Sequence, residues 1–341
     1  MLKFDMEDLT GTDFGGVALS GIIFTCCEMS SVKVVGSDFS GGSIYDCELS
    51  GAELRETNLD GLTLKASAGD SLKVESCSMM DTSLWSCTFS DLRLKSCKLG
   101  RANIMGNDLI GGVVEDCHIT SCTLEENALS SEEAPLKILR GEMRGSSFLN
   151  NGLEHALVDG TSLKDVAISE SDFSGSAFLA VEATGLVLKG KNVFSENSFI
   201  KTTILSSQID EKIVTLNLPR ISRSHWEFSK SGTVQFQSAE INHSSLEFVG
   251  GDLHFQHLYS EKMVLKTRHL DMRLSSRVYT PTFSVVTADF RNSTLTEPIF
   301  LFPSAVKKLS FVDCHIIKAD FRKFKKHQLE FVNTDTSSCL F

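Results

Sequence analysis

This 341-residue chain contains ten cysteines, whose thiols could bind a metal ion, form disulfide bonds or act as nucleophiles. Close pairs of cysteine are typical of zinc sites, and a cysteine-rich exported chain is typical of disulfide bonds. No Cys-x-x-Cys pair occurs here, and Cys77, Cys97 and Cys117 are instead spaced by twenty residues. The placement of the cysteines therefore supports neither a zinc site nor a disulfide framework.

The histidines and carboxylates do not form a second chemical motif. His254 and His257 are three residues apart, which on a strand places them on opposite faces. The sequence contains no His-Glu-x-x-His, no P-loop, no Gly-x-Ser-x-Gly and no dinucleotide fingerprint. We therefore predict a protein that is not an enzyme and that uses no metal and no cofactor.

A basic cluster is the remaining candidate site, and it consists of Arg322, Lys323, Lys325 and Lys326. Such a cluster can contact an acidic protein or an anionic membrane surface. The alternative is a solvated edge that discourages further strand pairing. The formal net charge of −11 is uneven along the chain, with 22 acidic against ten basic residues in 1–137 and 12 against 17 in 212–341. Direct binding of nucleic acid is therefore not expected.

A five-residue period determines where these side chains lie. Steps of five from Phe4 to Leu129 meet 26 positions, and all but Gly69 carry a large apolar residue. Five residues match neither the 3.6-residue period of a helix nor the two-residue period of a strand. A five-residue unit that always turns one side chain inward therefore needs a corner in every repeat. The positions between the apolar centres are rich in Gly, Ser, Asp and Asn, which are common in turns.

The position two before each apolar centre carries mostly small residues. Nine of the ten cysteines fall in this position, where cysteine serves as a compact apolar residue. Cys77, Cys97 and Cys117 are thus expected to form a structural inward ladder. Cys26 alone is out of register, and we expect it to be exposed.

The repeat resembles that of the pentapeptide-repeat family. Residues 50–64 (SGAELRETNLDGLTL) and 100–109 (GRANIMGNDL) are similar to its A(D/N)LXX pattern. The resemblance implies an all-β fold, a right-handed quadrilateral parallel β-helix in which four pentapeptides make one coil. It also implies that the central residue and the residue two before it face inward.

The register predicts two regions. Residues 1–209 are expected to form the β-helix, with the stretch SSEEAPLK at 130–137 as a loop inserted at one corner. After Ile209 the period degrades into alternating runs. Residues 210–341 are therefore expected to be an irregular β-rich continuation of the β-helix or a small capping domain, with a short helix near 301–309.

The resemblance also implies a function. Some family members are bacterial effectors that act on a host protein, and others imitate duplex DNA to protect topoisomerases such as gyrase. We predict a non-enzymatic protein-interaction or scaffolding protein, with the DNA mimic as the alternative. Met1–Phe14 has no apolar leader, so the expected location is the cytoplasm where the chain is made, with delivery into a host cell as a further expectation. Because a coil has open ends, pairing into a homodimer is also expected.

Overall fold

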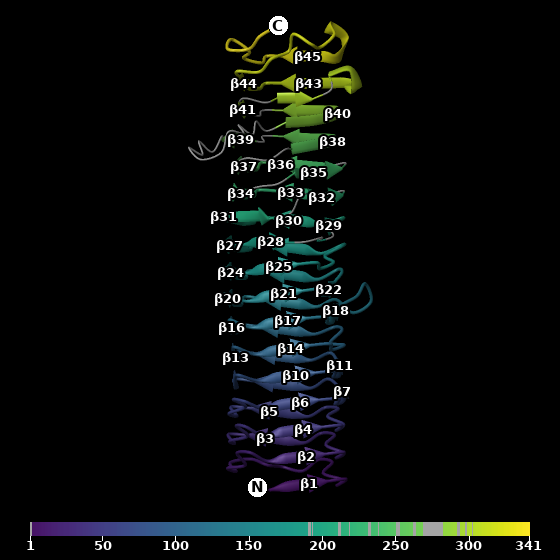
Figure 1. Cartoon of the computed structure of the whole chain (residues 1–341), viewed down its shortest axis with the longest axis vertical. Helices are drawn as coiled ribbons and strands as arrows, with labels where there is room; N and C mark the ends of the chain where they lie inside the picture. Colours follow the sequence, from purple (N-terminus) through teal and green to yellow (C-terminus); the bar gives the residue numbers. More distant parts are fainter. Residues whose placement is uncertain are drawn as a thin grey trace. The chain divides into compact units, whose positions relative to one another are not determined.

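The fold is the predicted parallel β-solenoid, seen in a computed structural model (Figure 1). The structure describes residues 2–189, 192, 194–210, 213–217, 219–230, 233–237, 239–249, 253–261, 264–268, 282–291, 294–296, 299–301 and 303–341. The chain divides into two compact units, unit 1 (Met1–Ser176) and unit 2 (Ala177–Phe341). The predicted division near residue 209 falls within unit 2 and stays a prediction.

Unit 1 is a stack of four-sided coils of twenty residues, whose sides we name faces A to D. Face A holds β1 (Lys3–Asp5), β2 (Ile23–Thr25), β4 (Ser43–Tyr45), β6 (Thr63–Lys65), β10 (Ser83–Trp85), β14 (Asn103–Met105), β17 (Thr123–Glu125), β21 (Ser147–Leu149) and β25 (Ala167–Ser169). Face B holds β7 (Ala68–Asp70), β11 (Thr88–Ser90), β18 (Ala128–Ser130) and β22 (Gly152–Leu153). Face C holds β3 (Lys33–Val35), β5 (Glu53–Arg55), β8 (Lys73–Glu75), β12 (Arg93–Lys95), β15 (Val113–Glu115), β19 (Lys137–Leu139) and β23 (Leu157–Asp159). Face D holds β9 (Ser78–Met80), β13 (Lys98–Gly100), β16 (His118–Thr120), β20 (Glu142–Arg144) and β24 (Ser162–Lys164).

The coil forms because each repeat ends in a corner. In unit 1 the residue two after a centre has left-handed backbone angles at every regular corner, with φ of 52° at Cys26, 53° at Asp46 and 68° at Gly61. Asp, Asn and Ser tolerate this region better than branched residues do. A carboxylate before the centre stabilises several turns, as where the Thr10 backbone N–H donates to Asp8 Oδ1 at 3.0 Å. Each coil then pairs in parallel with the next, as Ile44 with Leu64.

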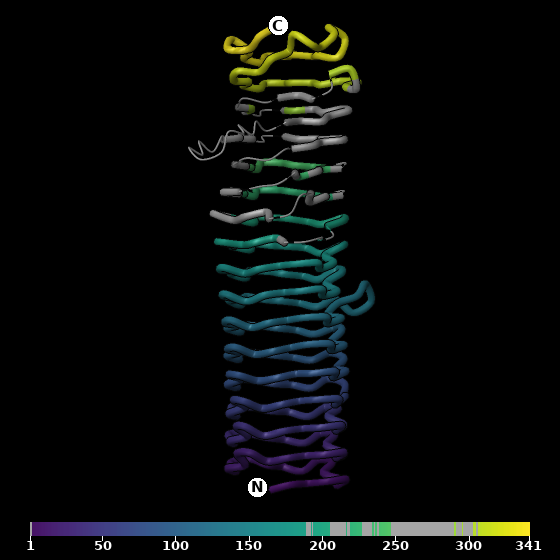
Figure 2. The backbone as a smooth tube through the Cα atoms, viewed as in Figure 1, coloured from purple at the N-terminus to yellow at the C-terminus, as the bar shows by residue number. Residues whose placement is uncertain are grey.

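An extra loop leaves unit 1 between β18 and β19 (Figure 2). Val114 pairs with Ile138, so this coil has 24 residues and four of them are additional. The Leu136 backbone N–H donates to Ser130 Oγ at 2.9 Å and closes the base of the loop. Leu129 and Ile138, which are nine residues apart, are therefore the centres of neighbouring sides of the coil, where the ordinary distance is five residues.

The interior of unit 1 is filled unequally along the stack. In residues 4–39, which we call the phenylalanine coils, the rings of Phe4, Phe14, Phe24 and Phe39 contact one another at centroid distances of 5.4 to 6.3 Å. In residues 44–143, the aliphatic coils, Leu, Ile, Val and Met occupy nearly all central positions. A cavity of about 100 Å³ runs between them, with an apolar lining that extends from Leu54 to Phe148.

Unit 2 is also built of strands that pair in parallel, and several of them are longer than the strands of unit 1. Its described elements are β26 (Ala177–Leu179), β27 (Glu182–Thr184), β28 (Val187–Lys189), β29 (Phe194–Ser195), β30 (Ser198–Ile200), β31 (Thr203–Asp210), β32 (Ile213–Asn217), β33 (Arg220–Ser222), β34 (His225–Lys230), β35 (Thr233–Gln237), β36 (Ala239–Asn242), β37 (Ser245–Val249), β38 (Leu253–Glu261), β39 (Val264–Arg268), β40 (Thr282–Arg291), β41 (Thr294–Thr296), β42 (Ile299–Leu301), η1 (Pro303–Ala305), β43 (Lys308–Val312), β44 (His315–Ile317), η2 (Lys326–Gln328) and β45 (Leu329–Val332). The strand β31 pairs with β27 near one end and with β28 near the other, so two sides of the coil merge into one.

The helical content of the described residues is confined to two short 3-10 turns, η1 and η2. The helix expected near 301–309 is the single turn η1. None of the described helices has the length and apolarity needed to span a membrane.

Candidate interaction surfaces

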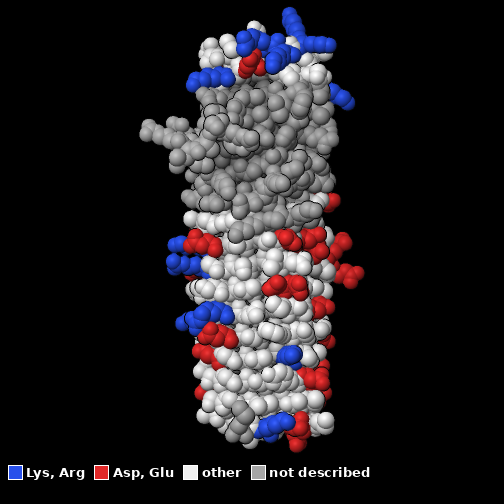
Figure 3. All heavy atoms as spheres, viewed as in Figure 1, with Lys and Arg blue, Asp and Glu red and all other residues white. Residues whose placement is uncertain are grey.

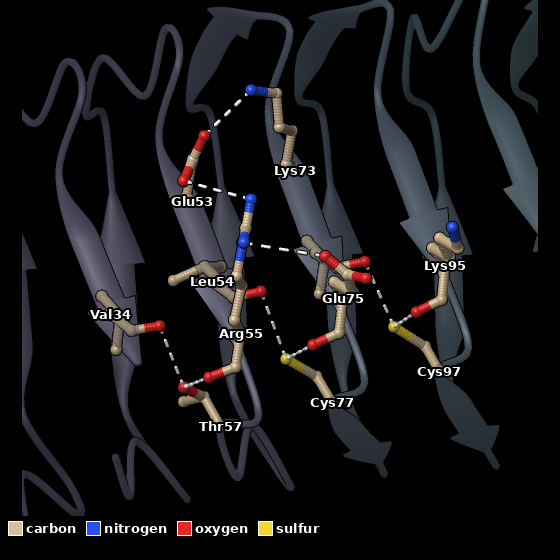
Figure 4. Close-up of polar contacts among 11 residues, drawn as sticks. Val34, Glu53, Leu54, Arg55, Thr57, Lys73, Glu75, Cys77, Lys95 and Cys97 are labelled. Atoms are coloured by element: carbon tan, nitrogen blue, oxygen red, sulfur yellow. Dashed lines mark hydrogen bonds and ion pairs between the residues drawn. The ribbon is translucent and has the colours of Figure 1, made fainter. Parts of the chain in front are cut away.

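The cysteine ladder lies inside unit 1, on face D. Cys77, Cys97 and Cys117 are buried, and all three are free thiols. The Cys77 thiol donates to the Leu54 carbonyl at 3.5 Å and the Cys97 thiol donates to the Val74 carbonyl at 3.3 Å. The Thr57 hydroxyl donates to the equivalent Val34 carbonyl at 3.2 Å one coil earlier (Figure 4). Sulfur and oxygen therefore serve the same structural purpose in this column.

Burial also makes most of these thiols unreactive. Hydrogen bonding to the Cys97 thiol and burial raise the pKa of Cys77 and of Cys117 far above the ordinary thiol range. Burial raises the pKa of Cys47 to about 11. Because the thiolate is the nucleophile and the metal ligand, such thiols are poor at both tasks. In the part of the chain that the structure describes, no group of three His, Cys, Asp or Glu side chains could hold a metal ion.

Cys26 is exposed, as its position out of register predicts, and Cys339 is half-buried. The side chains of His254 and His257 lie outside the described residues.

A ladder of buried asparagines on face B was not found by the sequence reasoning. Asn127 Nδ2 donates to Asn151 Oδ1 at 3.0 Å, and Asn107 Nδ2 donates to Asn127 Oδ1 at 2.9 Å. The same amides donate to the Ile104 and Leu84 carbonyls. The recurrence of asparagine two before the centre at 107, 127 and 151 could have revealed this ladder. Its amides are saturated by one another and by the backbone, so it is a structural element.

The basic cluster lies on a loop of unit 2 that the chain holds firmly in place. Gln328 Nε2 donates to the Pro303 and Val306 carbonyls at 2.8 and 2.6 Å, and Gln328 Oε1 accepts from the Lys325 backbone N–H at 2.7 Å. The ring of Phe324 contacts that of Phe321 at 5.8 Å. These anchors fix the loop between β44 and β45 and leave its charged side chains outside.

The four residues of the cluster are not equivalent. Arg322 forms a bidentate ion pair with Asp320, in which Nε donates to Oδ1 at 2.9 Å and Nη2 donates to Oδ2 at 2.7 Å. This pairing lowers the pKa of Asp320 to about 2. Lys323, Lys325 and Lys326 are exposed, and they make no ion pair within the described residues. The structure therefore assigns the unneutralised charge of this loop to the three lysines.

Charges on unit 1 are arranged differently on two faces. On face B, Asp8, Glu28 and Glu48 occupy one position in successive coils and form a column of like charge. On face C, opposite charges alternate: Lys73 Nζ lies 2.9 Å from Glu53 Oε1, and Arg55 Nε lies 3.7 Å from Glu75 Oε2 (Figure 4). Face B thus presents a column of negative charge, whereas on face C the charges of Glu53, Arg55, Lys73 and Glu75 pair with one another.

Comparison with known proteins gives the family. A family model described as pentapeptide repeats matches eight copies within residues 8–41. The chain therefore contains pentapeptide repeats. The five-residue repeats of the structure, with the centre and the residue two before it inward, agree with the expectation from the sequence.

Several solved structures are similar at low identity. HetL, a pentapeptide-repeat protein involved in heterocyst differentiation regulation in the cyanobacterium Nostoc sp. strain PCC 7120, is 16% identical, with 60% of this chain and 85% of HetL covered and a TM-score of 0.26. QnrB1, a plasmid-mediated fluoroquinolone resistance protein, is 12% identical over 52% of this chain and 86% of QnrB1, with a TM-score of 0.24. PfbA, a surface adhesin of Streptococcus pneumoniae, is 10% identical over 86% of each chain, with a TM-score of 0.36. A search of curated proteins finds no significant match.

Proposed function

We propose that this chain is a non-enzymatic protein-interaction scaffold, whose solenoid displays charged side chains to a protein partner. The proposal rests on the contrast between the hydrogen-bonded polar side chains of the interior and the charged side chains of the surface. The inner cysteines and asparagines are hydrogen-bonded in place, whereas Lys323, Lys325 and Lys326 lie on an anchored loop and form no ion pair with any residue that the structure describes. The partner surface that fits three lysines is acidic.

The experiment compares two triple charge reversals in the whole chain. One variant carries Lys323→Glu, Lys325→Glu and Lys326→Glu, and the matched control carries Arg93→Glu, Lys95→Glu and Lys98→Glu in unit 1. Partners captured by cross-linking from host-cell lysate are identified and then re-tested as purified proteins. We expect one acidic partner whose affinity falls at least tenfold in the first variant only. Equal binding by both variants would reject the basic cluster as the contact surface.

Action as a secreted bacterial effector is the finer form of this proposal. It is supported by the family resemblance and by the display of a basic loop to a partner. A translocation reporter fused to the chain and expressed in a bacterium with and without a working secretion system tests it. Reporter signal in the host cytoplasm that requires the secretion system is expected, and signal in neither strain contradicts it.

A DNA-mimicking topoisomerase-protection protein is the second candidate, because Asp8, Glu28 and Glu48 repeat a negative charge once per coil. Coils spaced by ~4.8 Å place this charge at a regular interval along face B. Inhibition of gyrase supercoiling by the purified chain, lost on changing these three residues to Gln and Asn, would favour this function. Inhibition that is absent, or unchanged in that variant, would remove the candidate.

Contact with a membrane surface is a further outcome that the basic loop allows. Sedimentation with vesicles of phosphatidylcholine and phosphatidylserine tests it, with phosphatidylcholine alone as the control. Binding that requires the anionic lipid and the three lysines would assign the loop to a membrane instead of a protein.

A further inference from the structure

Face A of unit 1 differs from the other faces in its outward side chains. From Ser43 to Ser147 the residue before each centre is small and polar, as at Thr63 and Ser83. The residue after each centre is larger and forms a second column. This column consists of Tyr45, Lys65, Trp85, Met105, Glu125 and Leu149, joined in this order by parallel pairing.

The centre of face A is weakly charged and partly apolar. The Trp85 side chain is 42% exposed, although large apolar residues are usually buried. Figure 3 views this face, where charged side chains are sparse over the centre of unit 1 and acidic ones gather along one edge. Trp, Tyr and Met are enriched in protein interfaces, from whose centres charged residues are depleted. Face A therefore has the composition of an interface.

Two charged side chains on face A lack an ion-pair partner among the described residues. Lys65 and Glu125 make no ion pair within the described part of the chain, in contrast to Glu53 and Lys73 on face C. Lys65 and Glu125 are three coils apart, which at ~4.8 Å per coil separates them by about 14 Å. They cannot reach each other within one chain.

We propose that face A binds a second copy of this chain in antiparallel orientation. A two-fold axis across the face, between the coils of Trp85 and Met105, places each column against itself in reverse order. Lys65 then opposes Glu125 of the second copy, Trp85 opposes Met105, and Tyr45 opposes Leu149. The small column matches in the same way, with Ser83 against Asn103 and Thr63 against Thr123. The same two-fold rotation thus pairs Lys65 with Glu125 and Trp85 with Met105. Both copies use the same surface, so the interface is isologous.

The size of the surface sets the strength of this dimer. Six coils and three-residue strands give a patch of roughly 24 by 10 Å. This area is well below the ~800 Å² per partner of a standard interface. The dimer is therefore weak and reversible, with a dissociation constant of roughly 10 μM to 1 mM. It uses face A and not the basic loop, so it stands independently of the proposed function.

The test is sedimentation equilibrium of the whole chain up to about 1 mM, with Cys26→Ser in every variant to prevent disulfide exchange. Lys65→Glu and Glu125→Lys singly are each expected to raise the dissociation constant about tenfold, since each places like charges together twice per dimer. The double exchange Lys65→Glu with Glu125→Lys is expected to return it to within about fivefold of the parent. Trp85→Ala is expected to abolish association.

Two controls keep the result specific. Lys95→Glu changes a face C lysine of the same charge and is expected to leave the dissociation constant unchanged. Ser83→Cys and Asn103→Cys chains mixed under mild oxidation are expected to form the mixed disulfide in preference to either homodimer. A monomer at 1 mM, a double exchange that fails to recover, or a preference for like-with-like disulfides would overturn the antiparallel dimer.

Discussion

The phenylalanine coils and the aliphatic coils of unit 1 have the same backbone and different interiors. Phe24 and Phe39 are 0% and 1% exposed, whereas Leu54 and Leu94 are each 8% exposed although they point inward. Leu54 and Leu94 both line the cavity of about 100 Å³. The five-residue sides and the coil-to-coil hydrogen bonds fix the cross-section, so the walls cannot close around smaller side chains. A solenoid thus keeps a void that a globular core would partly collapse.

The largest expected effect comes from removing a ring from the phenylalanine coils. Phe39→Ala is expected to lower the free energy of unfolding by about 4 kcal/mol, because it deletes a closely packed ring. Leu94→Ala in the aliphatic coils is expected to cost about 2 kcal/mol, because Leu94 already borders a void. Urea denaturation of both variants measures the difference. Equal losses would mean that the two interiors are equally packed.

The asparagine ladder of the aliphatic coils gives the next effect. Asn127→Leu is expected to cost about 3 kcal/mol, since it removes the oxygen that accepts from the buried Asn107 backbone N–H and side-chain amide, and one of the two donors to Asn151 Oδ1. Cys97→Ala, which removes one weak thiol donor from the same coils, is expected to cost about 1 kcal/mol. Thermal unfolding of the pair tests this ranking. A costlier cysteine change would show that sulfur packing, and not amide hydrogen bonding, stabilises these coils.

Alkaline pH is expected to loosen the aliphatic coils first, because they hold five buried thiols whose pKa is raised, those of Cys47, Cys77, Cys87, Cys117 and Cys122. Burial raises the pKa of Cys87 and of Cys122 above the ordinary thiol value of 9.0. Above pH 9 the unfolded chain has therefore released thiol protons that the folded chain retains. The stabilisation is complete below pH 9 and is lost as the pH rises. Hydrogen exchange at pH 8 and 10 measures it, and greater loss in residues 4–39 would contradict it.

Much of the fold could be predicted from the sequence because one local rule repeats. The period from Phe4 to Leu129 identifies each inward residue, and it places the cysteines correctly inside. The cavity could not be predicted, because it depends on how side chains from four faces meet. The unpaired state of Lys65 and Glu125 also needed the structure, since pairing depends on reach across coils. The predicted role of the basic cluster remains a prediction.

The most direct test of the account is a pair of Leu→Phe substitutions at inward central positions. Leu94 lines the cavity, and Leu49 is 3% exposed and does not line it. Leu94→Phe is expected to raise the free energy of unfolding by about 0.5 to 1 kcal/mol by filling space. Leu49→Phe is expected to lower it by about 1 to 3 kcal/mol by overpacking. Similar losses in both variants would contradict the claim that the backbone ladder holds open an underfilled interior.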